Sequence, residues 1–298
     1  MHGSDEHSLS FLEGSEARVF LQADGIAVRK LKHRSAATAM TSVQILLQIS
    51  QHPNVVRILA IDNGDIHMEA MHVSLQEHLP AGQPYCFHVK LHIARSVAQG
   101  LRHLHAHSME HGDLCPANVL LAWPACTPAA SKPRSHRAMQ VKLCDFYNDH
   151  TGTNRTAAYA APEVVRSTPR IMPAADVWAF ACCLLFLEGV QPFHGFEEDP
   201  AVLFYLAVHD CVAFREDAAV THFTLLDCAY APARHIGQTA WAHILAGAFA
   251  PEPRRLTSQQ LCDSLATLHA PAPAPAPAHT HTPKEKLQRA PLRRLNFN

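Results

Sequence analysis

The sequence predicts an α+β fold in two parts, a small β-rich part followed by a larger helical part. Three observations lead to this prediction. Short β-type runs and one helical pattern fill the first 70 residues, helical spacing of apolar residues begins near residue 86, and an apolar run covers 177–187. We expect the folded region over 9–269, with an extension over 1–8 before it and a tail over 270–298 after it.

The first part is predicted to hold four strands and one helix. The strands are short β-type runs, and the first two flank an Asp24-Gly25 turn, which is a hairpin signal. Apolar residues over 38–49 recur at helical spacing, and His52-Pro53-Asn54 then ends the helix. The expected strands are 17–21, 26–31, 55–61 and 66–71.

The second part is predicted to be mostly helical. Ile93, Val97, Leu101 and Leu104 form one apolar stripe, which predicts a helix beginning near residue 86. The apolar run over 177–187 is shorter than the about 20 residues that a membrane helix needs, so it predicts a buried helix.

Two further segments differ in composition from the rest. Residues 122–140 hold three prolines and several basic residues, which predicts a surface loop. Residues 270–278 alternate Pro and Ala, which favours an extended spacer, and a basic tail that we expect to be disordered follows.

The composition is typical of a globular chain. Of 298 residues, 48% are hydrophobic and 17% are charged, enough for a full hydrophobic core without disulfides. The formal net charge of −1 provides no overall field for nucleic acid or an acidic membrane, and we expect direct binding of neither. The nine cysteines include no CxxC pair, which favours a reducing compartment, so we predict an intracellular location, cytoplasmic or nuclear.

Four short segments combine the residue types that carry chemistry. They read HGDLCPAN at 111–118, VKLCDFY at 141–147, YAAPE at 159–163 and DVW at 176–178. In this order they resemble the eukaryotic protein kinase domain of the Ser/Thr type, with its HRDLKPxN, DFG, APE and DVW motifs. The resemblance covers about 9–269. It implies a bilobal kinase-like fold, with an N-lobe over 9–71 and a C-lobe over 72–269, that uses ATP and Mg²⁺ to phosphorylate protein hydroxyls.

The resemblance also assigns the central roles. Asp113 would accept the proton of the substrate hydroxyl, while Asn118 and Asp145 would bind the metal. Two acids and an amide suit a hard cation that prefers oxygen ligands, because phosphoryl transfer asks a protein mainly for positioning and charge stabilisation. Glu163 would pair with Arg255, and Asp176 would cap the catalytic-loop backbone.

Further residues are implied to surround the nucleotide. Strand alternation turns Ala27 and Arg29 into the cleft and Lys30 outward, unless a bulge reverses this, so Arg29 or Lys30 would contact phosphate. For the strand over 66–71, the alternative to an adenine contact is an ordinary buried strand, in which Met68 only fills space. The other implied contacts are Gly14 and Val19 in the glycine-loop segment, Met68 as gatekeeper, and the backbone of Glu69 and Met71 at the adenine edge.

Several positions depart from the family pattern. The glycine-rich loop keeps only Gly14, and the strand lysine is Arg29. The helix over 38–49 has no acid at 42–44, so the usual Lys–Glu ion pair cannot form. The other substitutions are Gly112 for the catalytic-loop arginine, Cys115 for its lysine and Tyr147 for the DFG glycine.

Three functions therefore stay open. Retention of the base and both metal positions favours an active kinase, with Pro116 and Thr156 favouring the Ser/Thr type. The departures favour a pseudokinase that acts as a binding scaffold, with activity weak or lost. The HGDxxxxN pattern at 111–118 also fits a small-molecule phosphotransferase of the aminoglycoside or choline kinase type.

The expected partner is a protein substrate. Arg293-Arg294-Leu295-Asn296-Phe297 resembles an RxLxF cyclin-docking motif, against the alternative of a basic disordered tail. His103 and His107 share a helix face and could bind a metal, although a structural role is favoured.

Overall fold

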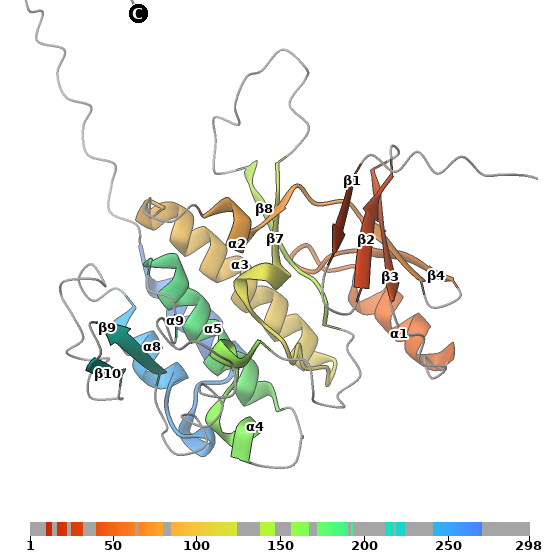
Figure 1. The fold of residues 1–298 in the computed structure, drawn as a ribbon. Helices are drawn as coiled ribbons and strands as arrows, with labels where there is room; N and C mark the ends of the chain where they lie inside the picture. Colours follow the sequence, from red (N-terminus) through yellow and green to blue (C-terminus); the bar gives the residue numbers. More distant parts are fainter. Residues whose placement is uncertain are drawn as a thin grey trace, which may run out of the picture.

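An antiparallel sheet comes first in the chain and a mostly helical region follows it, so the predicted two-part α+β fold is confirmed (Figure 1). The structure is a computed structural model. It describes residues 10–13, 17–22, 25–31, 40–62, 65–79, 85–123, 138–146, 156–166, 172–189, 192, 212–216, 219–223 and 241–269.

The first part is a five-stranded sheet with strand order β1-β2-β3-β5-β4 and one helix, α1 (Met40–Ile49), which contacts β4. The predicted hairpin is present, because β2 and β3 pair antiparallel. Gly25 has a φ of +81°, a turn conformation that glycine adopts without strain. The strands are β1 (Ser10–Glu13), β2 (Ala17–Leu21), β3 (Ile26–Leu31), β4 (Ile58–Asp62) and β5 (Asp65–Glu69).

The strand predicted over 55–61 begins only at Ile58. The preceding backbone is bonded elsewhere: the Val56 N–H donates to the Leu143 carbonyl at 2.8 Å, and the Leu143 N–H donates to the Asn54 carbonyl at 2.9 Å. The chain before β4 is therefore joined to a strand of the second part instead of to its own sheet. The strand predicted over 66–71 likewise ends early, at Glu69.

The second part contains a small sheet of order β6-β7-β8, the hairpin β9–β10, and the helices that build the core. The sequence did not predict β9–β10. The strands are β6 (Val73–Ser74), β7 (Val119–Ala122), β8 (Gln140–Leu143), β9 (Val212–Glu216) and β10 (Ala219–Phe223). The helices are α2 (Leu75–His78), α3 (Phe87–Ala106), α4 (Pro162–Arg166), α5 (Pro173–Leu187), α8 (Ala242–Ala248) and α9 (Ser258–Thr267), with short 3₁₀ turns at Pro116–Asn118, Ala157–Tyr159 and Glu252–Arg254.

Helices α3 and α5 form the centre of the second part, with α9 packed on α3 and α8 on α5 (Figure 1). The predicted stripe of α3 is buried, as is most of α5, because these apolar faces meet other helices. No helix among the described residues combines the length and the apolar character that crossing a bilayer requires. Most of the predicted loop, at 124–137, and the predicted tail lie outside the described residues.

Gly100 lets α3 approach the chain that precedes β4. A Cβ atom added there would lie 2.8 Å from the Asn54 carbonyl oxygen and 2.8 Å from Leu143 Cδ1. We expect Gly100→Ala to lower the free energy of unfolding by about 1–3 kcal/mol, the usual cost of overpacking. Denaturant unfolding would measure this change. Gln99→Ala, at the exposed neighbouring position, is the control, and equal stability of the two variants would contradict the prediction.

Candidate active site

Asp113 lies in the loop between α3 and β7, and its carboxylate is held from two sides. Oδ1 accepts the Thr156 N–H at 2.9 Å, and Oδ2 accepts a bond from Asn118 Nδ2 at 3.2 Å. The same Nδ2 donates to the Asp113 carbonyl oxygen at 2.8 Å, which closes the loop between the two residues. Burial raises the pKa of Asp113, while the Thr156 N–H opposes the shift. This carboxylate is thus oriented and more basic than an exposed one.

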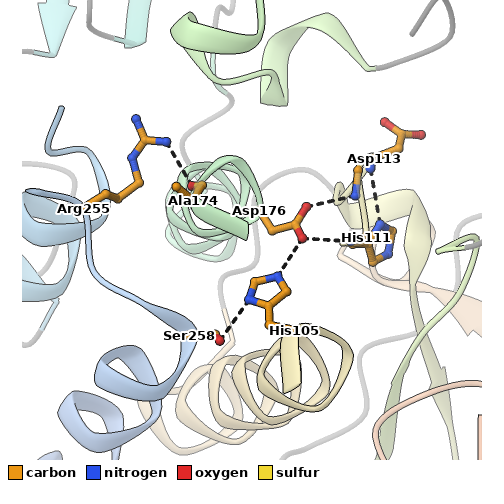
Figure 2. A network of polar contacts seen from close by, with 8 residues as sticks. His105, His111, Asp113, Ala174, Asp176, Arg255 and Ser258 are labelled. Carbon is orange, nitrogen blue, oxygen red and sulfur yellow. Dashed lines mark hydrogen bonds and ion pairs between the residues drawn. The ribbon is translucent and has the colours of Figure 1, made fainter. Parts of the chain in front are cut away.

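Asp176, on α5, anchors the backbone of this loop as the sequence predicts (Figure 2). Its Oδ2 accepts the His111 N–H at 2.8 Å, and its Oδ1 accepts the Gly112 N–H at 2.9 Å. Gly112 has a φ of +80°, so glycine at this position avoids the strain that a side chain would bring. Figure 2 shows the Asp113 carboxylate pointing away from Asp176.

His105 joins Asp176 to two helices. Its Nε2 lies 2.8 Å from Asp176 Oδ2, and its Nδ1 lies 2.9 Å from Ser258 Oγ at the start of α9 (Figure 2). Burial alone would raise the pKa of Asp176, but the bond and charge of His105 hold that pKa below its ordinary value. The loop anchor is therefore an ionised carboxylate tied to α3, α5 and α9 together.

Asp145, which directly follows β8 and Cys144, forms an ion pair with Arg29 of β3. Arg29 Nη2 lies 2.9 Å from Asp145 Oδ1 and 3.3 Å from Oδ2. The Asp145 backbone has a φ of +63°, in the left-handed region that is uncommon for residues other than glycine. Asp145 also lies close enough to Asp113 to contribute to the raised pKa of that group. The structure thus brings Asp113, Asn118, Asp145 and Arg29 to one place.

The donor set suits a hard divalent cation. Asp145 offers carboxylate oxygens, and the hydrogen bonds of Asn118 described above use Nδ2, not its amide oxygen. Among the described residues, no three His, Cys, Asp or Glu side chains gather as a metal cage. Mg²⁺ fits such a site, because it takes one or two protein oxygens and completes its shell with phosphate and water.

The register of the sheet places most of the predicted nucleotide contacts on one face. Val19 pairs with Arg29, and Ala27 pairs with Met68, so the four side chains share a face. Lys30 lies on the other face, with Nζ 5.2 Å from the centre of the Phe20 ring. Arg29 is therefore the cation that this strand turns toward Asp145.

The remaining predicted contacts are placed as follows. The Glu69 N–H donates to the Arg57 carbonyl at 3.0 Å, and its carboxylate pairs with Lys142 of β8. No sequence pattern indicated this pair, because it joins strands of different sheets. Met71 follows the end of β5 and is half-buried, and Gly14 lies outside the described residues.

Two cysteines line the site. Burial raises the pKa of Cys115 to about 11 and that of Cys144 well above its ordinary value. Thr156 Oγ1 lies 3.6 Å from Cys115 Sγ, where the family has a lysine. Both thiols are therefore protonated at neutral pH, and the site lacks the positive charge that this lysine would bring.

The predicted pair of Glu163 and Arg255 is present. Arg255 donates from both terminal nitrogens to the Glu163 carboxylate, one bond being 3.0 Å long, and also to the Ala174 carbonyl at 2.9 Å (Figure 2). It lies 5.2 Å from the Trp178 ring centre. These contacts fix the segment after Thr156 on α5, and so support the loop that holds Asp113.

His103 and His107 are packed as structural residues. His103 stacks on His52 with ring centres 4.4 Å apart, and its Nε2 lies 2.9 Å from the Ile49 carbonyl oxygen. His107 Nδ1 lies 2.8 Å from the His103 carbonyl oxygen. The two rings are thus engaged with the backbone at the end of α1 and on α3, in agreement with the structural role.

Comparison with known proteins finds the protein kinase domain. The family model described as "Protein kinase domain" matches residues 17–265. Among curated proteins, "Probable serine/threonine-protein kinase mkcC" of Dictyostelium discoideum is 26% identical over 213 residues, covering 67% of this chain and 22% of the relative.

Two other relatives are similarly distant. The human "Serine/threonine-protein kinase/endoribonuclease IRE2" is 28% identical over 183 residues, covering 56% of this chain and 19% of the relative. "Serine/threonine-protein kinase PLK4" of Drosophila ananassae is 30% identical over 174 residues, covering 55% of this chain and 19% of the relative. The chain thus spans about a fifth of the length of these relatives.

Proposed function

Because the chain belongs to the protein kinase domain family, we propose that it is a serine/threonine protein kinase that transfers the γ-phosphate of ATP to a protein hydroxyl. The observation that carries this proposal is the arrangement around Asp113. Its carboxylate is held by Thr156 and Asn118, and Asp145 lies close by. This arrangement has the acid–base group and the oxygen ligands that phosphoryl transfer requires.

In this proposal Asp113 accepts the proton of the attacking hydroxyl. The raised pKa makes its carboxylate a better proton acceptor, and the Thr156 N–H keeps Oδ1 in a fixed direction. Thr156 and Pro116 support hydroxyls of serine and threonine as the substrate groups, as their positions do in the family motif. The proposed partner is accordingly a protein substrate.

Asn118 and Asp145 would hold Mg²⁺, and Arg29 would contact the phosphates. When bound, Mg²⁺ neutralises charge that develops on the transferred phosphoryl group. The chain's own part is to keep Asn118 beside Asp113 and to present Val19, Ala27 and Met68 as one apolar face toward the adenine.

A second candidate is a binding scaffold that lacks transfer activity. The specific observation in its favour is the ion pair of Arg29 and Asp145, together with the absence of any acid in the sequence of α1. An Asp145 carboxylate that stays with Arg29 is less available to a metal. Nucleotide binding without Mg²⁺ dependence would be the property of such a scaffold.

Phosphorylation of the full chain by radiolabelled ATP would test the proposal. We expect incorporation by the natural chain and at least a tenfold loss in Asp145→Asn, about 1.4 kcal/mol or more of barrier. Asp62→Asn, an exposed carboxylate at the end of β4, is the matched control and should keep full activity. Equal, background-level labelling of all three proteins would contradict the kinase proposal.

Thermal unfolding with ATP separates the two candidates. A rise in melting temperature with ATP that becomes larger when Mg²⁺ is added supports the kinase, since a ligand that binds only the folded state stabilises it. A rise that is the same with and without Mg²⁺ supports the scaffold.

A further inference from the structure

Arg29 is a buried guanidinium, and a buried charge needs an opposite charge beside it. Its side chain is 8% exposed, on the face of β3 that looks toward the second part of the molecule. Removal from water costs an unpaired cation several kcal/mol, so burial is tolerated only with a partner. The helix that supplies this partner in the family pattern is α1, whose sequence, MTSVQILLQI, contains neither Asp nor Glu.

Asp145 supplies the missing negative charge. Arg29 Nη2 reaches both of its oxygens, at 2.9 and 3.3 Å, and the Asp145 side chain is 25% exposed, so the pair is partly shielded from solvent. The neighbouring acid is already engaged, because Asp113 accepts bonds from Thr156 and Asn118. Among the described residues, Asp145 is thus the acid that pairs with Arg29, in place of an acid on α1.

This pairing places Arg29 where a metal ion would bind Asp145. Arg29 Nη2 donates to Oδ2 and lies within ion-pair distance of Oδ1, which are the oxygens that a divalent cation would need. Two cations in contact with one carboxylate repel each other. We propose that Arg29 and the divalent cation compete for Asp145, and that the triphosphate of the nucleotide draws Arg29 away and opens the metal site. Nucleotide phosphate then binds before the metal, and Arg29 is the positioning residue that imposes this order.

The inference rests on the proposed nucleotide site, but it does not require that phosphate be transferred. Manganese is a suitable probe, because the fraction of free Mn²⁺ can be read by electron paramagnetic resonance with no nucleotide or substrate present. We expect Arg29→Met in the full chain to bind Mn²⁺ about tenfold tighter than the natural chain, equivalent to about 1.4 kcal/mol. Circular dichroism of each variant must show that the fold is kept, because an unfolded chain with 23 histidines can itself bind metal ions.

The same variant should bind nucleotide less well. Arg29→Met removes the guanidinium that the phosphates attract, so we expect metal-free ATP to bind about tenfold more weakly, as measured by calorimetry. Opposite changes for the metal and the nucleotide are the signature of competition. Lys30→Met, which removes one positive charge from the opposite face of the same strand, is the control and should change neither affinity.

A second pair of variants keeps the test decisive. Arg29→Gln serves where Arg29→Met unfolds, and Arg29→Met combined with Asp145→Asn should lose the gain in Mn²⁺ affinity. Unchanged Mn²⁺ binding in a folded Arg29 variant would overturn the inference, as would an equal gain in Lys30→Met. A kinase activity of zero in the natural chain would end the proposed function and leave this result standing.

Discussion

Asp113→Asn is expected to lower phosphoryl transfer by about 100- to 10,000-fold, the usual contribution of a positioned acid–base group. The amide can still accept the Thr156 N–H, which the carboxylate accepts at 2.9 Å, so the loop keeps that contact. It has no comparable affinity for the proton of the attacking hydroxyl. The loss should therefore fall on kcat, as measured by steady-state transfer from ATP to a protein substrate.

Two further readouts separate a lost base from a damaged site. Binding of ATP to Asp113→Asn should stay close to that of the natural chain, because Asp113 is assigned no nucleotide contact. Burial raises the pKa of Asp113, so the natural chain should lose activity on acidification at a higher pH than an exposed aspartate would cause. A kcat within about threefold of the natural value would exclude Asp113 as the base.

Asp176→Ala is expected to destabilise the protein by about 3–5 kcal/mol, the cost of breaking a buried charge network by removing one partner. The His111 and Gly112 N–H groups lose their acceptor, and His105 loses the carboxylate that lies 2.8 Å from its Nε2. Urea unfolding at neutral pH would measure the loss. Asp263→Ala, an exposed acid on α9, is the control and should stay within about 0.5 kcal/mol.

The effect of Asp176→Ala should depend on pH in a defined direction. The pKa of Asp176 is held below its ordinary value of 3.8, so the ionised carboxylate contributes stability above that value. The contribution is lost as the pH falls through the lowered pKa. The difference between the natural chain and the variant should thus be full at neutral pH and shrink below pH 3.8, and a pH-independent difference would contradict an ionised Asp176.

Contacts between residues that the family pattern names could be predicted from the sequence. Contacts that form where such a residue is missing could not. The links from Asp176 to the 111–118 loop and from Glu163 to Arg255 are contacts that the resemblance to the kinase domain implies. The pair of Arg29 and Asp145 does not, because it forms where an expected partner is missing. The sequence showed the missing acid on α1, but only the three-dimensional arrangement shows which carboxylate replaces it.

The prediction of strand boundaries was limited for a similar reason, because pairing with distant segments is not visible in the sequence. Val55 and Val56 have the β-branched character of a strand, yet their backbone reaches Leu143 of β8 instead of the neighbouring β5. The hairpin β9–β10 went unpredicted, although Val212–Glu216 and Ala219–Phe223 contain β-type residues. The local sequence pattern shows that a segment can form a strand. The packing of distant segments determines which strand it pairs with.

The bonds between β8 and the chain preceding β4 join the two parts of the molecule. Asn54 and Val56 exchange backbone hydrogen bonds with Leu143, and Asn54 Nδ2 also donates to the Val141 carbonyl at 3.0 Å. A rotation of one lobe against the other costs least when its axis runs through this bonded seam. Displacement in such a rotation would grow with distance from the axis, so the β1–β2 end of the sheet would move farther than the residues around β8.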